Sequence, residues 1–172
     1  MKTWIALLRG INVGGRHTVP MRDLKALMEA AGFANVRTYI QSGNVVFEGK
    51  SRPTDELPTL IEGEFGFRPE VFILSETELR TAIANNPFAA TEGKAIHFFF
   101  CDRSPKSFDR ALLDSVKSAS EDYALAGKVF YLYAPAGIAR STLVQKLGKA
   151  FAGVTMTARN LNTVRKLASM LD

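Results

Sequence analysis

The chain has 172 residues, of which 47% are hydrophobic and 23% are charged. These are the proportions of a globular protein that can bury a core. No run of about 18 or more apolar residues is present, which excludes a membrane-spanning helix. The single cysteine, Cys101, excludes an internal disulfide and is typical of a reducing compartment, so we expect a cytoplasmic protein with no membrane partner.

The net charge of +5 is concentrated in the second half of the chain. Residues 1–86 hold ten basic and ten acidic side chains, whereas residues 87–172 hold twelve and seven. A basic surface attracts phosphates and nucleic acids, although an excess of this size is also compatible with a surface that is only solvated.

Apolar periodicity and capping residues predict the elements of the first half. Gly32 ends a helix, Gly43 supplies the positive φ of a tight hairpin, and the capping-box pattern at residues 75–78 begins a helix that stops before Pro87. The predicted elements are a strand at 4–8, a helix at 21–31, strands at 36–41 and 45–48, a helix at 55–65 with Thr54 as its N-cap, a strand at 70–74 and a linking helix from 75 to about 84.

The same order of elements is predicted for the second half. These elements are a strand at 96–101, a helix at 105–116 with Ser104 as its N-cap, strands at 122–125 and 128–133, a helix at 141–151, a strand at 154–157 and an added helix at 162–171. Gly127 takes the place in the second hairpin that Gly43 takes in the first, 84 residues earlier. Little else aligns, so the repeat is mainly one of structure.

Strand-helix-strand-strand-helix-strand is the order of a ferredoxin-like unit. We therefore predict an α+β protein with two tandem ferredoxin-like (βαββαβ) units, at residues 1–75 and 89–172, joined by a linking helix at 76–88 and ending in an extra helix. Right-handed crossovers place the third strand of each unit between the first and the second. The loop after the first strand then lies beside the first hairpin, and the segments after the last two strands of the second unit share one end.

Four segments have the character of a family signature. They are residues 9–15 (RGINVGG), 39–47 (YIQSGNVVF), 86–88 (NPF) and 157–163 (TARNLNT). They resemble the signature segments of an uncharacterised bacterial family known as domain of unknown function 1697. The resemblance covers nearly the whole chain and implies an α+β fold of two similar halves, but no chemistry. The family often has an aromatic residue, usually Trp, where this chain has Leu161; if that ring stacks on a ligand in relatives, this chain lacks the contact.

The glycine-rich segment at residues 8–21 (LRGINVGGRHTVPM) is the first candidate site. Its spacing approaches that of a P-loop, but an arginine and a histidine replace the lysine and hydroxyl that bind phosphate and Mg²⁺, which excludes a nucleotide triphosphatase. Its backbone N–H groups can form an anion site, or the segment is a wide turn held by its own asparagine. The candidate ligand-binding residues here are Arg9, Asn12, Gly14, Gly15 and Arg16.

Three further places carry polar side chains that suit a ligand. Gln41, Ser42 and Asn44 surround the turn at Gly43, where they either bind an amide, a base edge or a sugar or only form the turn. Two arginine corners precede predicted helices, where a helix N-terminus beside an arginine can bind an anion. Their residues are Arg140 with Ser141 and Arg159 with Asn160, and both Ser141 and Asn160 are also natural N-caps.

The chain offers few groups for catalysis or metal binding. His17 lies in the glycine-rich segment and is the only candidate general base, whereas His97 lies in an apolar run and is expected in the core. Two histidines and one cysteine, far apart in the sequence, do not have metal-site spacing, so neither a metal site nor a cofactor is predicted.

Three functions remain open from these residues. The favoured hypothesis is a cytoplasmic binding protein for a phosphorylated small molecule or a nucleic acid, held in a cleft between the two halves. The second is an enzyme acting on such a ligand with His17 as acid or base, and the third is a protein-interaction module without a small ligand. The oligomeric state is not predicted, and a monomer is compatible with the sequence.

Overall fold

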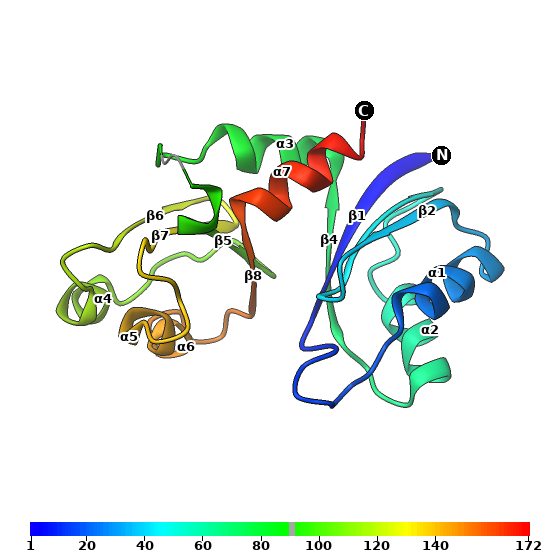
Figure 1. Cartoon of the computed structure of the whole chain (residues 1–172), viewed down its shortest axis with the longest axis horizontal. Coiled ribbons are helices and arrows are strands. Elements are labelled where there is room, and N and C mark those ends of the chain that lie inside the picture. The colour runs from blue at the N-terminus through cyan, green and yellow to red at the C-terminus, as the bar shows by residue number, and fades with distance from the viewer. Residues whose placement is uncertain (90–91) are drawn as a thin grey trace. The chain divides into compact units, whose positions relative to one another are not determined.

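The computed structural model describes residues 1–89 and 92–172 (Figure 1). The chain divides into two compact units, one made of Met1–Thr81 with Lys166–Asp172 and the other of Ala82–Arg165. None of the helices in the described residues is long and apolar enough to cross a membrane.

The first unit contains one four-stranded sheet. Its elements are β1 (Lys2–Arg9), α1 (Met21–Ala30), β2 (Ala34–Tyr39), β3 (Asn44–Gly49), α2 (Glu56–Phe65), β4 (Glu70–Ser75) and the start of α3 (Glu76–Ala84). The strand order is β2-β3-β1-β4, and all neighbouring strands are antiparallel. The third strand therefore lies between the first and the second, as predicted. Helices α1 and α2 lie together on one face of this sheet (Figure 1).

The second unit repeats this plan. Its elements are the end of α3, a short 3₁₀ turn η1 (Gly93–Ala95), β5 (Ile96–Cys101), α4 (Arg110–Val116), β6 (Asp122–Ala126), β7 (Val129–Tyr133), α5 (Thr142–Gln145), α6 (Leu147–Ala150), β8 (Met156–Asn160) and the start of α7 (Leu161–Ser169). The strand order β6-β7-β5-β8 is equivalent to that of the first sheet. The protein is therefore an α+β protein with two similar, tandem ferredoxin-like halves.

Each sheet buries an apolar face beneath its helices because alternate residues of a strand point to the same side. In the first unit Trp4, Ala6 and Leu8 of β1 pack with Leu24 of α1 and Ile61 of α2. The second unit has the equivalent cluster, with a higher aromatic content. Its buried members are Phe99, Leu113, Tyr123, Phe130, Leu132, Ala134, Leu143, Leu147, Ala150 and Phe151.

The predicted capping box is confirmed. The backbone N–H of Ser75 donates to Glu78 Oε2 at 2.9 Å, and the backbone N–H of Glu78 donates to Ser75 Oγ at 3.1 Å. These reciprocal bonds satisfy two of the donors that a helix leaves unpaired at its N-terminus. They explain why β4 passes directly into α3.

The predicted helix at 105–116 is wrong at its start, because α4 begins only at Arg110. Asp109, not Ser104, caps it by accepting a hydrogen bond from Leu112 N. Tertiary contacts hold the preceding segment out of the helix: Phe108 stacks on Phe151 with ring centroids 4.7 Å apart, and Asp109 N donates to Ala150 O at 2.9 Å.

Other predicted boundaries differ as well. The helix expected at 141–151 is interrupted at Lys146, which separates α5 from α6. The strand expected at 154–157 is displaced, since β8 spans Met156–Asn160 to pair with β5 from His97 to Cys101. Asp55, not Thr54, is the N-cap of α2, and its side chain makes no capping bond.

Gly43 and Gly127 occupy equivalent hairpins, with φ of 87° and 59°, but their surroundings differ. A Cβ at Gly43 would lie 2.8 Å from Leu8 Cβ and 2.9 Å from Ile11 Cδ1, whereas a Cβ at Gly127 has no atom within 4 Å. Only Gly43 is therefore enclosed by its neighbours.

We expect Gly43→Ala to destabilise the chain more than Gly127→Ala. Both changes place a side chain in the left-handed region at a cost of about 1–2 kcal/mol, and only Gly43→Ala adds a clash with backbone-proximal atoms. Urea unfolding followed by circular dichroism measures both. Equal losses of stability in the two variants would show that the close approach of Leu8 and Ile11 does not restrict the residue at position 43.

Candidate functional site

The structure brings the glycine-rich segment and the first hairpin together at one end of the first sheet. The backbone N–H of Leu8 donates to Gly43 O at 2.8 Å, and Asn12 Nδ2 donates to Gln41 O at 2.8 Å. The two segments therefore lie side by side, as predicted. Within this unit, the cluster of residues 9–19 and 39–44 is named the loop cluster below.

Asn12 uses its whole side-chain amide to hold the loop cluster. Its Nδ2 donates to Val19 O at 2.9 Å as well as to Gln41 O, and its Oδ1 accepts from Val19 N at 2.7 Å. Such an amide has two donor hydrogens and one acceptor oxygen, and all are engaged. The geometry therefore assigns Asn12 a structural task.

Gly14 and Gly15 form the tip of a small hairpin. Arg16 N donates to Val13 O at 3.0 Å, Asn12 N donates to His17 O at 3.1 Å, and the two glycines have φ of 58° and 72°. Two successive positive φ values are those of a type I′ turn. The glycines are thus needed for the turn, and the tip presents the exposed side chain of Arg16.

His17 is held flat against Phe67. Their ring centroids are 4.2 Å apart with an interplanar angle of 10°, and His17 Nδ1 lies 3.4 Å from Gly10 O. His17 is exposed and Phe67 half-buried. Phe67 was not predicted, because it is 50 residues distant in sequence; the pairing of Arg9 with Glu70 in the sheet brings it here.

Left-handed backbone is concentrated in the loop cluster. Among the described residues four non-glycine positions have positive φ, and three lie here: Asn12 (54°), His17 (50°) and Ile40 (50°). Ile40 is β-branched and 51% exposed, so burial does not offset its strain. Strained backbone of this kind clusters at functional sites.

The other predicted residues of this unit have mixed environments. Asn44 is buried and donates from Nδ2 to Tyr39 O at 3.1 Å and to Ser42 Oγ at 3.0 Å, which makes it part of the turn. Gln41 and Ser42 are exposed. Arg9 Nη1 lies 3.3 Å from Glu70 Oε1 in a half-exposed ion pair, so part of its charge is neutralised.

In the second unit, Ser141 is engaged in the fold. Its Oγ accepts from Val144 N as the N-cap of α5 and donates to Glu121 Oε2 at 2.5 Å. Burial raises the pKa of Glu121, but hydrogen bonds from Ser141 and Ser118 outweigh burial and leave this pKa below its usual value. The buried carboxylate is thereby kept ionised inside a local network.

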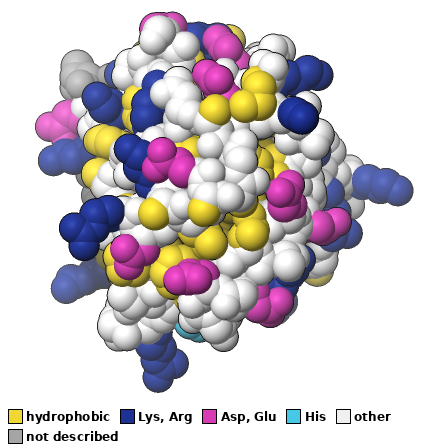
Figure 2. Space-filling view, turned by 90° about the vertical axis from the view of Figure 1, so that its right-hand side faces the viewer, with side chains coloured by type: hydrophobic (Ala, Val, Ile, Leu, Met, Phe, Trp, Pro, Cys, Tyr) yellow, Lys and Arg dark blue, Asp and Glu magenta, His cyan; other side chains and the backbone are white. Residues whose placement is uncertain are grey.

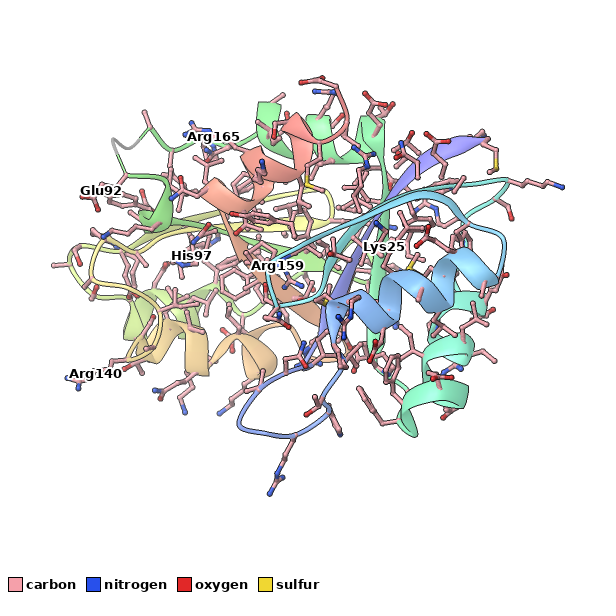
Figure 3. All side chains as sticks on the ribbon, turned by 45° about the vertical axis from the view of Figure 1, so that its right-hand side comes forward. Lys25, Glu92, His97, Arg140, Arg159 and Arg165 are labelled. Carbon is pink, nitrogen blue, oxygen red and sulfur yellow. The ribbon has the colours of Figure 1, made fainter. Side chains whose placement is uncertain are left out.

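The two arginine corners do not converge. Arg159 lies inside β8 rather than in a loop, it is 8% exposed, and it donates to Thr157 Oγ1 at 2.9 Å and Ala158 O at 2.8 Å. Burial lowers its pKa to about 10. Asn160 caps α7 by accepting from Thr163 N at 2.9 Å. Arg140 is exposed and points outward, well separated from Arg159 (Figure 3).

His97 is buried on the helix-covered face of the second sheet, as expected for a core residue. Its cross-strand neighbours are Leu132 and Asn160. Among the described residues, no group forms a hydrogen bond with its buried Nδ1. Burial lowers the pKa of His97, because the charged imidazolium loses hydration there.

We expect Ile40→Asn to stabilise the chain by about 1 kcal/mol, because asparagine tolerates the left-handed region and isoleucine does not. Val13→Asn is the matched control: Val13 is also β-branched and is 66% exposed, but its φ is not positive. Urea unfolding compares the two. A loss of stability in Ile40→Asn would mean that the isoleucine side chain makes a stabilising contact.

We expect His97→Leu to remove part of the acid sensitivity of folding. The native pKa of His97 lies below 6.5, so the unfolded chain binds the proton first as the pH falls. The stability contributed by neutral His97 is therefore complete above pH 6.5 and is lost below it. Thermal unfolding at neutral and at mildly acidic pH measures this loss of stability. The control is His17→Asn, which removes the other histidine and keeps His97. Identical acid losses in the wild type and His97→Leu would contradict it.

Comparisons with known proteins agree with this architecture. The structure is similar to a solved structure described as that of "conserved bacterial protein SP0830 from Streptococcus pneumoniae", with a TM-score of 0.74 and 23% identity over 99% of each chain, which shows a shared fold. No curated protein matches the chain. Residues 1–131 match the model of a family described as "Protein of unknown function (DUF1697)". The chain therefore belongs to the DUF1697 family, as its sequence segments predicted.

Proposed function

We propose that the protein is a cytoplasmic binding protein whose loop cluster holds a ligand with a nucleobase and a phosphate, either a free nucleotide or part of a nucleic acid strand. The observation that carries the proposal is the His17–Phe67 stack, held open to solvent beside Arg16. It supplies a flat surface and a cation within two consecutive residues.

The stack suits a base because every nucleobase has a planar π-face. Stacking a base on an aromatic side chain contributes about 1–3 kcal/mol without requiring a particular sequence. The outer face of the His17 ring is the available one, since Phe67 covers the other. His17 presents this face from a left-handed backbone conformation. That conformation costs free energy, and the surrounding fold holds it in place.

Arg16 supplies the positive charge that a phosphate requires. Among the described residues no carboxylate lies within ion-pair distance of its guanidinium, whereas Arg9 already pairs with Glu70. An arginine can bind a phosphate through two parallel hydrogen bonds. Arg16 is therefore the proposed phosphate contact and Arg9 a weaker one.

Binding is favoured over catalysis by the environment of His17. A general acid or base needs a partner that orients its ring and adjusts its pKa. Within residues 1–89 and 92–172, the His17 ring contacts Gly10 O and the Phe67 ring, and no carboxylate accepts a hydrogen bond from it. The ring is thus placed for stacking.

A cytoplasmic location in a bacterium is part of the proposal. Cys101 is buried, and burial raises its pKa to about 11, which keeps it as an unreactive thiol. Such a thiol is compatible with a reducing compartment.

Isothermal titration with a nucleotide, the matching nucleoside, a sugar phosphate and inorganic phosphate tests the proposal. We expect the nucleotide to bind most tightly, and His17→Asn to weaken it by about 5–150-fold, the equivalent of the 1–3 kcal/mol of one stacked base. Asparagine is chosen because it keeps the left-handed backbone without a ring.

Arg16→Gln is expected to reduce the difference between nucleotide and nucleoside, while Arg22→Gln, an exposed cation on α1, leaves both affinities unchanged. A short oligonucleotide distinguishes a strand from a free nucleotide. The stacking role would be overturned if sugar phosphates bound as tightly as nucleotides. It would also be overturned if His17→Asn kept the wild-type affinity for the nucleotide.

A further inference from the structure

The net positive charge belongs to the second unit alone. Residues 82–165 contain eleven basic and six acidic side chains, whereas the first unit contains eleven of each. Figure 2 shows the face of the molecule that carries α1 and α2, where both acidic and basic side chains are present among apolar ones. The net positive charge that can attract a polyanion is therefore carried by the second unit.

The acidic side chains of the second unit are already engaged locally. Glu121 is held by Ser141 and Ser118, as described above. The other five are Glu92 paired with Lys94, Asp102 paired with Arg103, Asp109 capping α4, Asp114 accepting from the Tyr123 hydroxyl, and Asp122 accepting from Tyr123 N. Each of the six therefore has a local partner, and among the described residues none of them forms an ion pair with Lys106, Arg140, Lys146 or Lys149.

Four cations lie in the helices of this unit or in the segments next to them, and they are named the basic face: Lys106, Arg140, Lys146 and Lys149. Among the described residues none of them has a carboxylate within ion-pair distance. Lys146 joins α5 to α6, Lys149 lies in α6, and Arg140 immediately precedes the N-cap of α5. Figure 1 shows α4, α5 and α6 on the same side of the sheet.

Lys106 lies in the segment before α4, and contacts of that segment hold it beside the end of α6. Phe108 stacks on Phe151, directly after α6, and Asp109 N donates to Ala150 O at 2.9 Å. The segment that carries Lys106 is therefore fastened to the end of α6. Lys106, Arg140 and Lys149 are exposed, and Figure 3 shows Arg140 pointing away from the protein.

The chemistry of the basic face fits a nucleic acid better than a membrane. A helix that binds a lipid surface must present apolar side chains to the acyl chains. Here Leu143, Leu147 and Ala150 are buried in the core. Within the described part of the chain, the large hydrophobic side chains that are strongly exposed are Met1, Val13 and Ile40, all in the first unit.

We propose that the basic face binds the phosphate backbone of a nucleic acid. Separate cations on neighbouring elements can each contact one phosphate, whereas a small anion would need donors that converge. Phosphate contacts of this kind release condensed counterions, so the affinity falls with salt by about 0.7–0.9 logarithmic units per contact for each tenfold rise. This inference does not depend on the stack at His17.

Fluorescence anisotropy with a labelled single-stranded oligonucleotide and its duplex, between about 50 and 200 mM salt, tests the proposal. The full chain is compared with the triple variant Lys106→Gln, Arg140→Gln, Lys149→Gln. We expect the variant to bind more weakly, and the slope of log affinity against log salt to become less steep by about 2 for the single strand.

The matched control is Arg22→Gln, Lys25→Gln, Lys50→Gln, which removes the same charge from exposed positions of the first unit. It is expected to keep the wild-type slope. Equal effects of the two triple variants would overturn the basic face, because net charge alone would then explain binding. An unchanged slope in the first variant would also overturn it.

Two further comparisons separate the possible outcomes. Vesicles containing phosphatidylserine identify a lipid surface: a triple variant that loses vesicle binding but keeps oligonucleotide binding would overturn the proposal. His17→Asn separates the two sites, since it is expected to lower oligonucleotide affinity without changing the salt slope. A changed slope in Arg16→Gln, with none in the triple variant, would place the phosphate contacts at the loop cluster instead.

Discussion

The three hydrogen bonds of the Asn12 side chain hold the end of the first sheet together. They close the segment between Ile11 and Val19 and connect it to the backbone of the first hairpin at Gln41. Opening the loop would exchange these three bonds for hydrogen bonds to water and would free the segment to move, which costs part of the stability of the closed form. The small hairpin at Gly14 and Gly15 and the orientation of His17 both depend on this closure.

The two units have the same strand order but different surfaces. The loop between the first strand and the first helix forms a strained hairpin in the first unit, whereas in the second unit the equivalent segment packs through Phe108 on Phe151, directly after α6. The first unit is electrically balanced and carries a stacked ring pair, and the second carries the net charge. The strand order alone therefore does not define the chemistry of either unit.

Burial gives several polar residues of the second unit a structural role. Arg159 and His97 lie within sheet strands, on opposite faces, and both have their pKa lowered by burial. Ser141 and Asn160 cap helices, and Ser141 also helps to keep Glu121 ionised. These residues are tied to the stability of the second unit, whereas Arg140 projects into solvent and belongs to its surface.

The amino-acid sequence by itself determined the order of the elements, the topology of both sheets, the two hairpin glycines, the capping box at Ser75 and the proximity of the glycine-rich segment to the first hairpin. These follow from local rules of periodicity, turn chemistry and crossover handedness. Only the tertiary structure decided the late start of α4, the extent of β8, the burial of Arg159 and the contact of His17 with Phe67. Each depends on side chains distant in sequence, such as Phe108 with Phe151, whose packing overrides local preference.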